Sequence, residues 1–142
     1  MFFLKSGNII PSERIGVIKL NMTFEEVIKI VDEFEIEDLP VSSVVVCGDV
    51  KIWVNKEKNT VTQISVYGSF EGKYADKIGI GSSLDDVTNL LHSGWTEDLY
   101  VYFINGVQGM CLEHGDTEDE NTEDVEWNEN TALIKVISIF VD

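Results

Sequence analysis

The stretch "VIKLNMTFEEVIKIV", residues 17–31, has the pattern of a short strand that leads into a helix. Apolar side chains recur at helical spacing from Phe24 to Val31. Thr23 stands just before them as a candidate N-cap, and Glu26 follows three residues later, as in a capping box. We therefore expect a helix that begins directly after Thr23.

The same pattern returns sixty residues later as "KIGIGSSLDDVTNLL", residues 77–91. In this second copy Ser83 takes the place of Thr23, and Asp86 takes the place of Glu26. Carboxylates in the first turn of a helix interact favourably with the helix dipole. We therefore interpret the acidic pairs that open both helices as capping residues and not as catalytic acid–base pairs.

Strand-like segments separated by turn residues follow each copy of the motif. They are "SVVVCG", "VKIWVN" and "TVTQISVYG" after the first copy, and "LYVYFI", "GMCLEH" and "ALIKVISIFVD" after the second. Asn105-Gly106 is a hairpin signal. The run "DEFEIED", residues 32–38, is interpreted as the solvated end of the first helix.

These patterns predict an α+β fold in which two helix-plus-antiparallel-meander repeats form a sheet with helices on one face. The first repeat would span residues 1–68 and the second residues 77–142, with a linker at 69–76. The second repeat also carries an acidic insertion at 114–130, where the first repeat has only a short turn.

The charge balance limits the classes of partner. The chain of 142 residues has a formal net charge of −16. Residues 1–76 hold twelve acidic and eight basic side chains, whereas residues 77–142 hold fourteen acidic and two basic ones. Phosphate binding needs clustered Lys and Arg, so nucleic acid and anionic membranes are disfavoured. A basic protein is the natural complement.

The acidic insertion is the first candidate binding surface. A mobile solvated loop and a calcium site are alternatives to a contact surface, although the insertion lacks the glycine and distant Glu of an EF-hand loop. We expect contact with a basic protein, with an aromatic anchor among charges that steer encounter. The residues concerned are Asp116, Glu118, Asp119, Glu120, Glu123, Asp124, Glu126 and Trp127.

The sheet offers a second candidate surface. Apolar and other side chains alternate along the predicted strands, so that one set faces the helices. If the aliphatic set faces the helices, four aromatic residues share the open face: Trp53, Tyr67, Tyr100 and Tyr102. Exposed aromatic residues on one sheet face are typical of protein contacts, although a second subunit or the loop could also cover them.

Catalytic and metal-binding motifs are absent from the sequence. The two histidines, His92 and His114, have no metal-ligand partner at helical spacing, and no nucleophile elbow or phosphate-binding loop is present. We expect no enzyme activity, no cofactor and no metal. The residues Cys47 and Cys111 are far apart and predict reduced thiols, and the N-terminus does not have the pattern of a secretory signal, which predicts a cytoplasmic protein.

The pattern "IxLxMTxEEVxxIV", followed by strands and a turn such as "NKEKNTVTQI", resembles the repeat of the BamE-like (SmpA/OmlA) lipoproteins. It is also similar to the tandem-repeat β-lactamase-inhibitor-protein fold, in which two units form one concave sheet that grips a protein. The chain departs from both in lacking a lipobox and the disulfides of a secreted inhibitor.

Without those features the resemblance, together with the charge, implies a bacterial toxin immunity protein. Such a non-enzymatic binding module would neutralise a basic toxin, for instance a nuclease, by occluding its active surface. The alternative is a structural or assembly module that homodimerises through its sheet face.

Overall fold

The computed structural model describes residues 7–99, 101–114 and 130–141, and in them the chain forms thirteen strands and two short helices. Helix α1 spans Phe24–Ile30 and α2 spans Leu84–Leu91. The first strands are β1 (Ile9–Ile10), β2 (Arg14–Ile15), β3 (Ile18–Lys19), β4 (Glu35–Asp38), β5 (Ser42–Cys47), β6 (Val50–Asn55) and β7 (Thr60–Tyr67). The others are β8 (Lys73–Tyr74), β9 (Ile78–Gly79), β10 (Trp95–Asp98), β11 (Val101–Ile104), β12 (Met110–Glu113) and β13 (Val136–Phe140).

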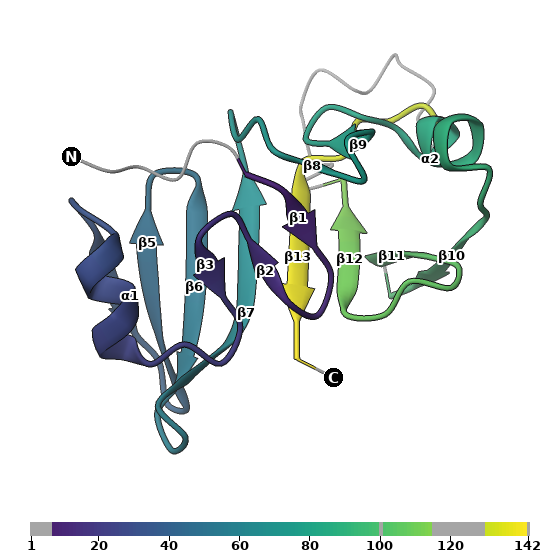
Figure 1. Ribbon diagram of the computed structural model, residues 1–142. Coiled ribbons are helices and arrows are strands. Elements are labelled where there is room, and N and C mark those ends of the chain that lie inside the picture. Colours follow the sequence, from purple (N-terminus) through teal and green to yellow (C-terminus); the bar gives the residue numbers. More distant parts are fainter. Residues whose placement is uncertain (1–6, 100, 115–129, 142) are drawn as a thin grey trace, which may run out of the picture.

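The larger sheet has eight antiparallel strands in the order β10-β11-β12-β13-β7-β6-β5-β4 (Figure 1). Each half is a four-strand meander, and the two halves meet where β7 pairs with β13 at the centre of the sheet. In that central pair Ser65 lies opposite Ser138, and Ile64 lies opposite Ile139. From the centre outward, each half therefore runs from its last strand in the chain to its first.

The smaller sheet has five strands of two residues each, in the order β3-β2-β1-β8-β9. It lies across the middle of the larger sheet in Figure 1, and its only parallel pair joins β1 to β8. The hairpin of β1 and β2 reaches the end of β12, where the backbone N–H of Ser12 donates to the carbonyl oxygen of Gly109 at 3.3 Å. Gly109 has a φ of +75°, and a Cβ there would overlap Ser12, so this close approach requires glycine.

A single hydrophobic cluster joins the two sheets and the two helices. From the larger sheet it includes Ile52, Ile64 and Ile137, and from the helices it includes Val27 and Val87, all of which are fully buried. Side chains alternate along a strand, so these residues define one face of the larger sheet, here called the core face. The opposite face, which carries Trp53, Ser65, Tyr67 and Ser138, is here called the open face.

The predicted fold class is wrong. The helices have only seven and eight residues, and much of the core face is covered by the second sheet of very short strands. The protein is therefore mostly β, and not an α+β fold with helices on one face. Each two-residue strand is too short for its sequence to show the alternation that predicts a strand, which is why this sheet was not anticipated.

The motif at the start of each repeat is confirmed. Thr23 and Glu26 form a capping box at α1, and Ser83 and Asp86 form one at α2. In α2 the Ser83 hydroxyl accepts from the N–H of Asp86 at 3.2 Å, and the Asp86 carboxylate accepts from the N–H of Ser83 at 2.9 Å. The carboxylates at both helix starts therefore have a structural role.

All six predicted strand segments form strands, but each meander has a fourth strand that was missed. The run 32–38 is not the end of a helix, because α1 ends at Ile30 and β4 pairs with β5. Its residues Glu35, Glu37 and Asp38 lie on β4 at the edge of the sheet, where charges are common because they discourage pairing with other chains. The segment 69–76 includes β8, which lies between β1 and β9 in the smaller sheet.

Both helices of the described part are far too short to cross a bilayer, and neither is apolar enough to do so.

Candidate functional site

The open face has small polar residues at its centre. Along β7 the buried Ile64 and Val66 point to the core face, whereas Gln63, Ser65 and Tyr67 point to the open face. Ser65 lies beside Ser138 on β13, and each side chain is only 4% exposed. Two serines thus occupy the positions where the two halves of the sheet meet.

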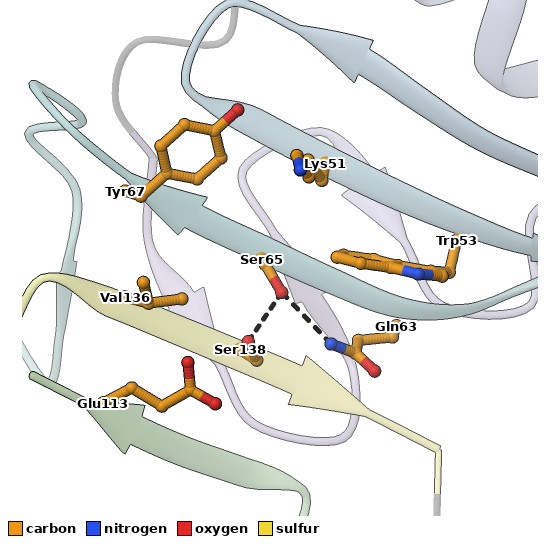
Figure 2. Close-up of a pocket in the computed structure, with 8 residues that line it drawn as sticks. All are labelled: Lys51, Trp53, Gln63, Ser65, Tyr67, Glu113, Val136 and Ser138. Carbon is orange, nitrogen blue, oxygen red and sulfur yellow. Dashed lines mark hydrogen bonds between the residues drawn. The ribbon is translucent and has the colours of Figure 1, made fainter. Parts of the chain in front are cut away.

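These serines form a hydrogen-bonded group. The hydroxyl oxygens of Ser65 and Ser138 are 2.6 Å apart, and the amide nitrogen of Gln63 donates to the Ser65 hydroxyl at 3.2 Å (Figure 2). The group satisfies the polar atoms at low exposure, where an unpaired hydroxyl would be destabilising.

Larger side chains surround the serines and leave a pocket of about 450 Å³ above them. Ser65, Ser138 and Val136 lie in its floor, because their side chains are short. Its walls come from three strands: Lys51 and Trp53 from β6, Gln63 and Tyr67 from β7, and Glu113 from β12. The pocket therefore arises directly from small residues on the central strands and large ones around them.

The turn between β5 and β6 fixes the position of Tyr67. Its hydroxyl donates to the carbonyl oxygen of Gly48 at 3.2 Å, and its N–H donates to the carbonyl oxygen of Asp49 at 3.1 Å. Partial burial, followed by the nearby carboxylates of Asp49 and Glu37, raises the pKa of the Tyr67 hydroxyl. The phenol is therefore a neutral hydrogen-bond donor at neutral pH.

Asp49 also ties this turn to the end of β7. Its carboxylate accepts from the hydroxyl of Ser69 at 2.7 Å and from the N–H of Ser69 at 3.0 Å, and these bonds lower the pKa of Asp49. Gly68 has a φ of +62°, and a Cβ there would lie 2.6 Å from an Asp49 carboxylate oxygen. The close fit of this turn against Gly68 holds the Tyr67 wall of the pocket in place.

The two charged residues of the pocket differ in their surroundings. The ammonium of Lys51 lies 4.0 Å from the carboxylate of Glu37, which is on the neighbouring edge of the sheet. Glu113 has no ion pair or side-chain hydrogen bond with any residue in the described ranges. Glu113 therefore leaves an uncompensated negative charge on the β12 side of the pocket.

Cys111 lies beside Ser138 in the pairing of β12 with β13. Burial, followed by the negative charge of Glu113, raises the pKa of the Cys111 thiol to about 11. The thiol is therefore protonated at neutral pH and is not an activated nucleophile. Neither Cys47 nor Cys111, both within the described part, is joined in a disulfide.

The structure brings together only some of the predicted binding residues. Trp53 and Tyr67 line the same pocket on the open face, as their alternation predicts. Tyr100 lies outside the described residues, and so do all eight predicted residues of the insertion: Asp116, Glu118, Asp119, Glu120, Glu123, Asp124, Glu126 and Trp127.

The placement of Tyr102 on the open face is wrong. Its side chain is 3% exposed and belongs to the hydrophobic core, where its ring centroid lies 5.4 Å from that of Trp95 and 4.9 Å from that of His114. The alternation predicts that Leu99, Val101 and Phe103 face inward, but Tyr102 and Ile104 face the core instead. Val101 and Phe103 are consequently the half-exposed residues of the strand.

The small and charged residues of the pocket were not among the binding residues predicted from the sequence. Alternation already placed Lys51, Gln63 and Ser65 on the open face, but only the aromatic residues of that face were singled out. Ser138 and Glu113 carried no such signal, because β13 and β12 are brought next to β7 only by the pairing of β13 with β7. That pairing joins residues far apart in the chain.

Within the described part of the chain no group of three or more His, Cys, Asp or Glu side chains is arranged to hold a metal ion. Comparisons with protein-family models, curated proteins and solved structures found no match to this chain.

Proposed function

We propose that this chain is a non-enzymatic protein-binding module, an immunity protein that neutralises a basic toxin such as a nuclease. The pocket at the centre of the open face carries the proposal. It combines two half-buried aromatic residues, Trp53 and Tyr67, with an uncompensated carboxylate, Glu113. Aromatic residues in a pocket near the centre of a surface are typical of the positions that dominate binding energy.

The overall charge supports a basic partner. A formal charge of −16 attracts a cationic protein over long range and speeds its association, in a way that salt weakens. The broad sheet would then cover the active surface of the toxin, and its central pocket would hold one projecting side chain. The acidic residues that open the helices need no catalytic role, because they cap the helices.

The proposal places the protein in the cytoplasm, where a producing cell needs protection from its own toxin. The thiols of Cys47 and Cys111 are not joined in a disulfide, which supports a reducing compartment. Both sequence-level candidate surfaces remain part of the proposal: the open face, and the acidic insertion at 114–130 as a steering element.

Affinity capture from the native host tests the proposal. Wild-type protein should retain a basic protein at low salt and release it at high salt, and Trp53→Ala should retain much less. Co-expression of wild-type protein with the captured partner should restore growth that the partner alone inhibits. Failure of the wild-type protein to capture any partner, equal capture by Trp53→Ala, or a captured partner without toxicity would contradict the proposal.

Light scattering separates this function from homodimerisation through the sheet face. The proposal expects a monomer across the concentration range. A stable dimer that Trp53→Ala dissociates would instead favour an assembly role for the same face.

A further inference from the structure

We propose that the pocket on the open face receives one arginine side chain of the partner, with the guanidinium group at Glu113. The inference rests on the proposed function, since it names the group of the basic partner that the pocket recognises.

The charges of the pocket favour a cation at one end. Glu113 has no ion-pair partner among the described residues, so an incoming cation would meet a carboxylate that is not already neutralised. The ammonium of Lys51 does not repel a cation at Glu113, because it lies on the side of β4, 4.0 Å from the carboxylate of Glu37. β6 and β12 are three strand spacings apart, or about 14 Å. The pocket therefore has a negative end near β12.

The shape of the pocket suits a long side chain that lies along the sheet. Its floor of Ser65, Ser138 and Val136 is low, and Tyr67, Val136 and Glu113 lie side by side on three neighbouring strands (Figure 2). A volume of about 450 Å³ is enough for a large side chain together with part of its backbone. A side chain that crosses Val136 would have the Tyr67 ring on one side and the Glu113 carboxylate on the other.

Arginine fits these groups better than lysine does. A guanidinium group is planar, so it can stack against an aromatic ring and donate two parallel hydrogen bonds to one carboxylate. Tyr67 supplies aromatic surface on one side of Val136, and Glu113 supplies the carboxylate on the other side. The Ser65 and Ser138 hydroxyls add acceptor atoms in the floor for further N–H groups.

Titration with N-acetyl-arginine amide, followed by the backbone amide signal of Val136 in NMR spectra, tests the inference without the partner. We expect saturable binding with a dissociation constant on the order of 1 mM, a usual value for so small a ligand. N-acetyl-citrulline amide has nearly the same shape but no charge, and should bind at least ~10-fold more weakly, as expected for loss of a charge-assisted hydrogen bond.

Glu113→Gln should weaken binding of the arginine derivative by ~10-fold or more, because it removes the charge without changing the shape. Glu57→Gln is the matched control, since it makes the same substitution at an exposed turn between β6 and β7 and should leave binding unchanged. Ser138→Leu, which fills the floor, should also abolish the shift.

No saturable shift up to tens of millimolar would overturn the inference, and so would equal binding of citrulline or of N-acetyl-lysine amide. Full binding by Glu113→Gln would overturn it as well. None of these results would contradict the toxin-binding proposal, because the capture experiment with Trp53→Ala tests it separately.

Discussion

The two faces of the central strands differ in composition although they share one backbone. On the core face of β7 and β13 lie the fully buried Ile64, Ile137 and Ile139. On the open face of the same strands lie Ser65 and Ser138, which are almost as buried but are polar and short. The aliphatic face is explained by burial of apolar area, which contributes roughly 25 cal/mol per Å².

Stability does not explain the serines in the same way. β-Branched residues are favoured in the middle of a sheet, so valine at both positions would suit the sheet at least as well. Serine side chains are short and polar, so a pocket remains above them at the centre of the open face. The core face therefore stabilises the fold, whereas the open face forms a cavity.

The largest expected effect is on the core face. Ile64→Ala removes a fully buried side chain and should lower the free energy of unfolding by about 2–5 kcal/mol, because a cavity remains. Ser65→Ala on the opposite face should cost less, about 1–3 kcal/mol, because it removes the hydrogen bonds to Gln63 and Ser138 but leaves only a small cavity. Urea denaturation of both variants measures the difference. Equal losses would break the distinction between the faces.

The thiol in the open face gives the next largest effect. Because the pKa of Cys111 is raised from 9.0 to about 11, its thiolate fraction at pH 8 should be ~100-fold lower in the folded chain than in the unfolded one. Iodoacetamide labelling, assigned to Cys111 by peptide mass spectrometry, should therefore be slow in buffer and fast in urea. Rapid labelling of the folded protein at pH 8 would contradict this burial.

The raised pKa of Cys111 also makes stability depend on pH. The unfolded chain loses the Cys111 proton first as the pH rises, so this residue should reduce stability progressively from about pH 9 to pH 11. Cys111→Ser should remove that part of the alkaline loss of stability, as measured by thermal unfolding at several pH values.

Trp53 should affect binding far more than folding. Trp53→Ala should weaken partner binding by ~30-fold or more, the size of a binding hot spot. It should change unfolding free energy much less than Ile64→Ala does, because the Trp53 side chain is half-exposed. Titration calorimetry with the captured partner, beside urea denaturation, separates the two quantities. Tyr102→Phe is a useful contrast, since that residue lies in the core and should leave binding unchanged.

The smallest effect is expected at the helix caps. Ser83→Ala and Thr23→Ala should each lower the free energy of unfolding by about 1 kcal/mol, because each removes the acceptor for a backbone N–H. Neither should change binding of the arginine derivative. Thermal unfolding and the same NMR titration check both statements, and a loss of binding would show that the caps position the pocket.

The sequence predicts the local elements of this fold well. The two capping boxes and six of the strands follow from patterns within fifteen residues, and these patterns survive in the structure. The fold class failed because β4, β10 and the five-stranded sheet consist of acidic or very short segments without a clear alternation. Their pairing depends on distant partners, which local patterns do not specify.

The candidate site was predicted in part for the same reason. Trp53 and Tyr67 lie on two consecutive strands, so their alternation placed both of them on the open face correctly. Glu113 and Ser138 join them only through the pairing of β13 with β7. Tyr102 was misplaced because its neighbours Trp95 and His114 lie on or beside other strands, and strand pairing, not local alternation, brings them together with Tyr102 in the core.

The most direct test of the open face as a binding site is the double variant Ser65→Val/Ser138→Val, measured for stability and for partner binding. Replacing both members of the hydrogen-bonded pair leaves neither hydroxyl unpaired, so the unfolding free energy should stay equal or rise. The added methyl groups should fill the floor and weaken binding of the captured partner by at least ~10-fold, as for loss of a well-packed anchor. Full partner binding by a stable double variant would contradict the central claim that these serines form a binding pocket.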